Sequence, residues 1–302
     1  MTPTAGTIRV FHHPATLEHD AGSGHPESPE RIRAILRTLR EGPLACRLAV
    51  EDAPAADRDA LERVHPATYL DALQRLVQQG GGRLDEDTVA SPGSWDAALR
   101  AAGGAVAAMR SAVAGVPAFA AVRPPGHHAL ADRAMGFCLI NNVAVAAHAA
   151  LAEGVARVLI VDWDVHHGNG TQAIVERDPR IRYVSLHQWP LYPGTGRADE
   201  RGVGNIFNVP RPPGLPRAEY VAALDAAVQD ATDGWLPELM LLSAGFDAMA
   251  GDPLAGFTLE PDDYAEWVTR WRALGVPIAS VLEGGYAPTR IAVAVETHLA
   301  AL

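Results

Sequence analysis

The fold is indicated most directly by the segment Val161-Asp162-Trp163-Asp164-Val165-His166-His167, which completes an apolar, β-rich run over residues 156–161. A second apolar run, over residues 239–242, leads in the same way into Ser243-Ala244-Gly245-Phe246-Asp247. Short apolar runs bounded by turn-forming residues are typical of buried strands in a parallel sheet. The sequence therefore predicts an α/β protein in which Asp and His side chains directly follow two strands.

Three further β-rich runs also end in polar side chains. Residues 116–122 run into Arg123-Pro124-Pro125-Gly126-His127-His128, residues 181–185 into Leu186-His187, and residues 276–282 into Glu283-Gly284-Gly285-Tyr286. A single Asp after a strand is often only a helix cap or a turn former. Open α/β sheets, however, bind their ligands outside the carboxyl ends of the strands. Five such strand ends together therefore indicate a functional site at one edge of the sheet.

This edge would hold a candidate metal site. Asp164, His166 and Asp247 supply two carboxylates and one imidazole. Three protein ligands of this kind can hold a divalent metal and leave coordination positions open for water and substrate. The strand-end placement thus predicts metal-assisted chemistry.

Composition limits the class of protein. The chain has 302 residues, of which 48% are hydrophobic, and neither a repeat nor a long linker divides it, so we expect one large domain over residues 1–302. Its two cysteines, Cys46 and Cys138, give no disulfide framework and favour a reducing cytoplasm. We expect no signal peptide, because Met1–Gly6 carry no basic region and no long apolar stretch, and no membrane span, because no apolar run reaches spanning length.

Charge narrows the function further. The net charge is −11, and all 25 basic residues are arginine. The absence of lysine excludes Schiff-base lysine chemistry and a P-loop lysine. A negatively charged chain without a basic run is a poor binder of nucleic acid. The abundance of Ala, Arg, Gly and Pro is typical of GC-rich bacterial coding sequences.

Helices alternate with the predicted strands, the first of which covers residues 7–11. The first helix is expected to begin with Ser28 as its cap and Pro29 in its first turn. Periodic apolar positions predict the other helices over residues 95–114, 141–153, 218–231 and 262–272, and a last helix through Ile291, Val295 and Leu299. Alternation of this kind predicts a three-layer α/β fold with a mostly parallel sheet.

At this point the strand-end motifs match a known family. The chain resembles the zinc-dependent histone deacetylase and acetylpolyamine amidohydrolase superfamily from about residue 11 to residue 286, and the Asn-Gly-Thr-Gln ending of one motif is similar to the class II branch. The resemblance implies an arginase-like fold with a central eight-stranded sheet. The matching motifs are Arg123-Pro124-Pro125-Gly126-His127-His128-Ala129, Gly136-Phe137-Cys138, residues 162–172, Ser243-Ala244-Gly245-Phe246-Asp247-Ala248 and Leu282-Glu283-Gly284-Gly285-Tyr286.

The resemblance assigns a role to each strand-end group. Asp164, His166 and Asp247 match the zinc ligands, although their oxygen-rich set would also suit Fe²⁺ or Co²⁺. His127 and His128 match a tandem pair of general acid–base residues, with Asp162 and Asn169 as their partners. Tyr286 matches a phenol that stabilises the tetrahedral oxyanion.

The resemblance also implies a substrate tunnel and a second cation. The tunnel positions are Gly136, Phe137, Tyr192, Leu254 and Gly284. A buried potassium ion would be held by Asp162, Asp164, His166, Ser185 and Leu186. The substrate would be an acylated primary amine, either an acyl-lysine peptide or an acetylpolyamine.

Two other functions remain as alternatives. A non-catalytic acyl-ligand binder is disfavoured by the intact set of catalytic positions. An arginase-type hydrolase with two metals is disfavoured by Trp163 and the single Asp-x-His motif. Apolar Leu254 argues against a polyamine substrate, whereas acidic Glu18, Asp20 and Glu27 near the entrance argue for it. The sequence does not determine the acyl length or the oligomeric state.

Overall fold

A computed structural model describes residues 6–302 of the chain. Residues 1–5, which belong to the segment where no signal peptide is expected, lie outside the described residues. Within the described residues, eight strands form one sheet in the order β2-β1-β5-β10-β9-β6-β7-β8, and every neighbouring pair is parallel. The prediction of a mostly parallel eight-stranded sheet is confirmed, with no antiparallel strand in it.

Six strands of this sheet lie close to their predicted positions. Two strands were not predicted, and both lie at the edges of the sheet: β2 (Leu48–Asp52) and β8 (Ile206–Arg211). The other six are β1 (Ile8–His12), β5 (Ala118–Ala120), β6 (Val158–Asp162), β7 (Ile181–Gln188), β9 (Leu239–Ala244) and β10 (Ile278–Leu282).

Burial explains why the inner strands were visible in the sequence. Every residue of β6, β9 and β10 is buried. A parallel sheet covered by helices on both faces selects apolar residues on both sides of each strand, which gives continuous apolar runs. The edge strand β2 is half exposed and reads instead as a mixed sequence.

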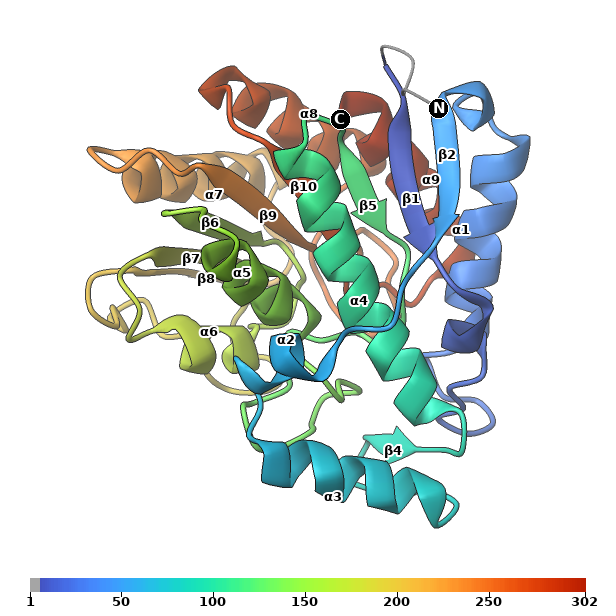
Figure 1. The fold of residues 1–302 in the computed structure, drawn as a ribbon. Helices are drawn as coiled ribbons and strands as arrows, with labels where there is room; N and C mark the ends of the chain where they lie inside the picture. Colours follow the sequence, from blue (N-terminus) through green and yellow to red (C-terminus); the bar gives the residue numbers. More distant parts are fainter. Residues whose placement is uncertain (1–5) are drawn as a thin grey trace.

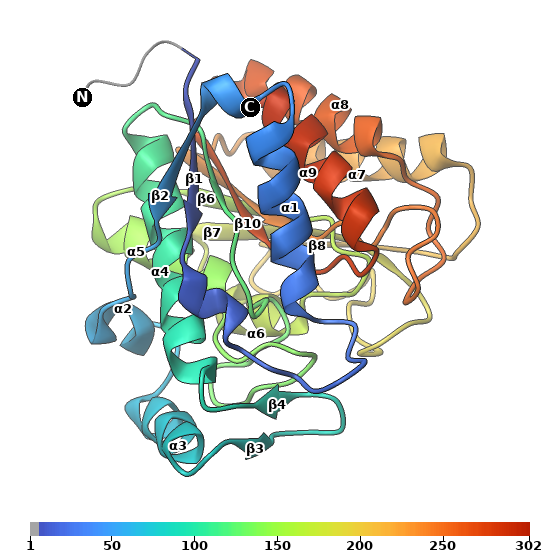
Figure 2. The same ribbon diagram turned by 90° about the vertical axis from the view of Figure 1, so that its right-hand side faces the viewer.

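Helices cover both faces of the sheet (Figures 1 and 2). Helices α1, α7, α8 and α9 lie on one face, where α1 and α8 both contact α9, while α4 and α5 pack together on the other. A buried apolar cluster fills the space on each side. The helices are α1 (Pro29–Glu41), α2 (Arg58–Glu62), α3 (Ala67–Gln78), α4 (Ser94–Val113), α5 (Asn142–Ala152), α6 (Asn169–Val175), α7 (Arg217–Thr232), α8 (Pro261–Trp271) and α9 (Pro288–Ala301).

Local capping accounts for several helix boundaries. The side chain of Asn141 accepts a hydrogen bond from the N–H of Ala144 and so begins α5. Glu260 and Asp263 form a reciprocal capping box at the start of α8. Ser28 occupies the cap position of α1 as predicted, but its side chain makes no capping hydrogen bond, so Pro29 and the fixed backbone define that start.

The topology brings together the strands that carry the candidate site. Strands β5, β10, β9, β6 and β7, which precede the five polar segments, are consecutive neighbours in the sheet. Loops that follow these strands therefore meet at one edge. The short hairpin of β3 (Gly82–Arg83) and β4 (Val89–Ala90) lies with α3 at the end of the molecule toward which the arrows of β1 and β2 point (Figure 1). No helix in residues 6–302 is both long and apolar enough to span a bilayer.

Candidate metal and catalytic site

Three ligand atoms converge at the centre of this edge. Asp164, His166 and Asp247 each offer an atom that lies within 4.8 Å of the other two, and all three residues are buried. The Nδ1 atom of His166 lies 3.1 Å from a carboxylate oxygen of Asp164 and 3.1 Å from one of Asp247. Among the described residues this is the group of His, Cys, Asp and Glu side chains with metal-binding geometry.

The electrostatics of these three residues fit a cation. Burial and, after it, the nearby charge of Asp164 raise the pKa of Asp247 to about 7. Burial lowers the pKa of His166, but its hydrogen bonds to Asp164 and Asp247 outweigh this and bring it to about 10. The two carboxylates thus draw positive charge to the point between them. A divalent metal is the ion that this donor set fits.

Backbone groups hold the carboxylates in place. The N–H of Val165 donates to Asp247 at 2.8 Å, and the N–H of Gly284 donates to Asp164 at 2.7 Å. Position 284 has room for a hydrogen only, because a Cβ atom there would lie 2.1 Å from an oxygen of Asp247 and 2.5 Å from one of Asp164. Glycine at this position therefore leaves the space beside the ligands open.

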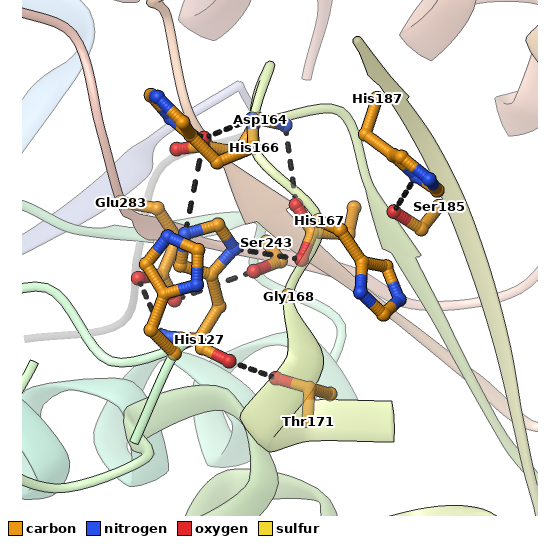
Figure 3. A network of polar contacts seen from close by, with 12 residues as sticks. His127, Asp164, His166, His167, Gly168, Thr171, Ser185, His187, Ser243 and Glu283 are labelled. Carbon is orange, nitrogen blue, oxygen red and sulfur yellow. Dashed lines mark hydrogen bonds and ion pairs between the residues drawn. The ribbon is translucent and has the colours of Figure 1, made fainter. Parts of the chain in front are cut away.

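The tandem histidines lie next to this group and have different partners. The Nδ1 atom of His127 is 3.1 Å from a carboxylate oxygen of Asp162, whereas the Nδ1 atom of His128 is 2.8 Å from the amide oxygen of Asn169. The two rings are 4.0 Å apart at their centroids. Figure 3 shows His127 beside the Asp164–His166 pair.

This difference in partners separates the two imidazoles chemically. Burial lowers the pKa of His127, but the charges of Asp164 and Asp162 raise it to about 10. Burial lowers the pKa of His128 well below its usual value, and the positive charges of His127 and His166 lower it further. One ring of the pair therefore favours the cation, and the other favours the neutral base.

Tyr286 approaches the site from the segment after β10. Its backbone N–H donates to Asp252 at 2.8 Å, and the guanidinium of Arg31 lies 5.1 Å from the centre of its ring. Arg31 also donates to the backbone oxygens of Glu283 and Gly285. Burial raises the pKa of the Tyr286 phenol well above its usual value, so this hydroxyl remains a hydrogen-bond donor at neutral pH.

A pocket of about 230 Å³ leads to these groups. Its aromatic walls are Phe137 and Tyr192, and the ring of Tyr192 is 5.2 Å from that of His128. Gly136 permits close packing here, since a Cβ atom on it would lie 2.5 Å from the His128 ring. The pocket is lined by Asp87, His128, Gly136, Phe137, His166, Leu191, Tyr192, Leu254 and Tyr286.

One residue of this pocket, Asp87, was not among the residues that the sequence predicted for the site. The structure places Asp87 in the lining of the pocket. The neighbouring Thr88 accepts a hydrogen bond from the N–H of Phe137 at 2.9 Å, and Phe137 has a left-handed backbone with φ of 69°. The Nε2 atom of His25 forms a hydrogen bond with the backbone oxygen of Asp87 at 3.1 Å. Asp87 follows no strand of the main sheet. An expectation that site residues directly follow these strands therefore could not predict it.

A buried arginine cluster supports the entrance segment. Arg123 binds both carboxylate oxygens of Glu27 at 2.7 Å, and Arg31 binds Glu27 at 3.2 Å. Burial raises the pKa of Glu27, but Arg123 outweighs this and lowers it to about 2. Glu27 is therefore ionised and neutralised inside the protein, so the expectation that it contributes acidic charge at the entrance is wrong.

The residues expected to bind potassium include two of the metal ligands, Asp164 and His166, and the other three belong to the paired strands β6 and β7. Asp162 and Ser185 face each other across the β6–β7 pair. The Ser185 hydroxyl lies 2.9 Å from Nδ1 of His187, and Leu186 follows in the same strand. His187, His12 and His13 each form a hydrogen bond with a backbone group, as structural histidines do.

Comparisons with known proteins agree on one family. The family described as the histone deacetylase domain matches residues 25–302. The chain is 42% identical to a histone deacetylase-like amidohydrolase from Pseudomonas aeruginosa, covering 89% of this chain and 74% of that protein. It is 41% identical to a probable deacetylase from Methanothermobacter thermautotrophicus, covering 92% and 86%.

A solved structure supports the same assignment. The crystal structure of the HDA15 HD domain superposes with a TM-score of 0.92 at 38% identity, over 97% of this chain and 90% of that one. The chain therefore belongs to the histone deacetylase family of amidohydrolases.

Proposed function

We propose that this protein is a metal-dependent deacylase that removes an acyl group, acetyl in the first instance, from the amine of a lysine side chain or a similar alkylamine. The observation that carries the proposal is the meeting of the Asp164–His166–Asp247 group, the two histidines and Tyr286 around one pocket. A binder without catalysis would need none of these titratable groups.

We propose zinc as the metal, with Fe²⁺ or Co²⁺ as possible substitutes because the donor set is rich in oxygen. Asp164, His166 and Asp247 would hold the ion. When bound, such an ion acidifies a water molecule and polarises an acyl carbonyl. The remaining steps fall to the side chains of the chain itself.

In this proposal His128 is the general base. Its low pKa keeps it neutral, so it can accept the proton of the attacking water and later give it to the leaving amine. His127 remains cationic beside Asp162 and stabilises negative charge as it develops. The phenol of Tyr286 donates a hydrogen bond to the oxyanion.

The pocket supports a straight alkyl chain as the part of the substrate next to the amide. Phe137 and Tyr192 provide flat apolar walls, and Leu254 extends them at the rim. The carboxylate of Asp87 at the same pocket would accept hydrogen bonds from backbone N–H groups of an acyl-lysine peptide. These features favour an acyl-lysine peptide.

An acetylpolyamine is the second candidate, and the acidic residues Asp85 and Asp87 keep it open. Both raise the pKa of Tyr192, after burial as the main cause, which reflects negative charge near the pocket. Neutralised Glu27, however, adds nothing to attract a second ammonium group. We therefore rank the polyamine below the peptide.

We further propose a structural potassium ion at Asp162, Asp164, His166, Ser185 and Leu186, and one deacetylase domain over residues 1–302. Free Cys46 and Cys138 favour a cytoplasmic location, and the composition favours a bacterial source. Neither nucleic acid nor a membrane is part of the proposal, because the chain carries a net charge of −11 without a basic run.

The experiment is a substrate panel with zinc-loaded protein. Acyl-lysine peptides of increasing acyl length and acetylated polyamines are assayed for amine release, with Asp247→Ala as the metal-site control. We expect hydrolysis of acetyl-lysine peptides by the wild type and loss of activity with loss of metal in the variant. No hydrolysis of any amide by protein that holds one equivalent of zinc would refute the proposal, and faster turnover of polyamines would reverse the order of substrates.

A further inference from the structure

Glu283 is a fully buried carboxylate that none of the roles above uses. It follows β10 directly, and no ion pair within residues 6–302 includes it. Its Oε2 atom accepts hydrogen bonds from the N–H of Gly126 at 2.6 Å and from the N–H of His127 at 3.1 Å. Its Oε1 atom accepts one from the hydroxyl of Ser243 at 3.3 Å. Figure 3 shows Glu283 with Ser243 and His127.

Burial of this carboxylate is costly, so its position calls for a cause. Taking a carboxylate out of water costs several kcal/mol unless hydrogen bonds and charges offset that cost. What an apolar side chain at 283 would lack is an acceptor for two buried N–H groups.

The two N–H groups belong to the turn that carries the tandem histidines. Gly126 and His127 are buried, and His127 and His128 depend on the course of this turn for their positions. Glu283 supplies one oxygen atom to both groups. The turn is thereby fixed to the end of β10.

The backbone of Glu283 is held just as firmly. Its N–H donates to Ala244 at 3.1 Å, and its carbonyl oxygen accepts a hydrogen bond from Arg31. The next residue, Gly284, donates to Asp164, and Tyr286 follows two positions later. Glu283 therefore touches the histidine turn through its side chain and belongs to the Tyr286 segment through its backbone.

We propose that Glu283 is a positioning residue that fixes the histidine turn against the Tyr286 segment, and so sets the separation between the general base and the oxyanion donor. The inference rests on the proposed deacylase function. It assigns Glu283 the role of hydrogen-bond acceptor, which a neutral isostere can also fill.

The isostere gives a sharp test. In Glu283→Gln the amide oxygen can accept from Gly126 and His127, while the amide nitrogen can donate to the Ser243 hydroxyl. We expect kcat within about threefold of wild type for this variant. In Glu283→Leu the acceptor is lost, and we expect kcat per bound metal to fall by about 10²-fold, the scale of a misplacement of about 1 Å, with KM changed less than about threefold.

Two further variants serve as controls. Ser243→Ala removes one contact of the carboxylate without touching the histidine turn, and it should retain wild-type kcat. Glu283→Asp keeps the charge but ends about 1.5 Å short of the turn, so it should be slow like the leucine variant. Because it keeps a carboxylate, the aspartate variant also decides the question if the leucine variant does not fold.

A second readout is independent of activity. Amide hydrogen exchange at Gly126 and His127 should accelerate at least tenfold in the leucine and aspartate variants, but not in the glutamine variant. The proposal would be overturned if Glu283→Asp had the kcat and the amide exchange rates of the wild type. It would also be overturned if the kcat of Glu283→Gln were as low as that of Glu283→Leu. If the wild type hydrolyses nothing, the deacylase function fails, and amide exchange alone still decides the positioning role.

Discussion

Replacing Gly284 with alanine tests whether the three converging side chains bind the metal. A Cβ atom at this position would lie 2.1 Å from an oxygen of Asp247, where side-chain contacts below 3.0 Å are essentially never seen. The carboxylate must therefore retreat by about 0.9 Å. Metal–ligand distances tolerate changes of only about 0.2 Å. Because position 284 has no left-handed backbone, alanine brings contact and no backbone strain.

We expect Gly284→Ala to weaken zinc binding by at least about 10–100-fold, the range seen when groups that only orient metal ligands are changed. Competitive titration with a chromophoric chelator measures this affinity directly. Gly82→Ala is the matched control, since its Cβ atom would meet only Leu76 at 3.3 Å. Zinc affinity within about threefold of wild type, in a variant that unfolds at the wild-type temperature, would refute the assignment of the metal site.

Three other changes test the charge arrangement around the site. His128→Ala should lower kcat by about 10²–10⁴-fold and His127→Ala by less, because only His128 is held neutral; steady-state kinetics in which His127→Ala is the slower enzyme would reverse their roles. Asn169→Asp places a carboxylate 2.8 Å from His128 and should raise its pKa by about 1–3 units, so the acidic limb of the kcat/KM profile should move to higher pH; an unmoved limb would contradict the proposed base. Glu27 has a folded-state pKa of about 2, below its unfolded value of about 4.3, so its ionised form stabilises the fold at neutral pH and this contribution is lost as pH falls toward 2. Glu27→Gln should therefore lower the free energy of unfolding at pH 7 by up to about 3 kcal/mol and flatten its dependence on pH between about 5 and 2, as measured by denaturant titration; the same slope as wild type would show that Arg123 does not depress the Glu27 pKa.

The sequence predicted the inner strands better than the outer ones, for a physical reason. Strands β6, β9 and β10 are buried on both faces, so their apolar runs stand out. Edge strands β2 and β8 are partly exposed and carry mixed residues, which resemble loops in a pattern based on hydrophobicity. Their existence followed only from the family resemblance, which implied eight strands.

The expectation that site residues follow the carboxyl ends of strands likewise predicted the groups that follow strands, but not those that reach the site from other loops. It brought Asp164, His166, Asp247 and His127 to one edge, where the structure has them. Asp87 reaches the pocket from the β3–β4 hairpin, and no strand of the main sheet points to it. Contacts between distant segments, such as that of Glu283 with Gly126, depend on which strands are neighbours in the sheet. The local sequence pattern of each strand does not determine this order.

The buried carboxylates of the site show why a metal belongs at one particular pair of them. Asp162 has His127 and the Tyr183 hydroxyl as partners, and Glu283 has two N–H groups and a serine hydroxyl. Asp164 and Asp247 instead face each other across a single imidazole, and Asp247 keeps a pKa of about 7 even with that ring beside it. Within residues 6–302, these two carboxylates and the imidazole between them are the group whose ligand atoms converge within 4.8 Å of one another, as a metal site requires. That pair, with His166, is the set that the family resemblance assigns to the metal. The convergent geometry and the sequence motif therefore lead to the same three residues.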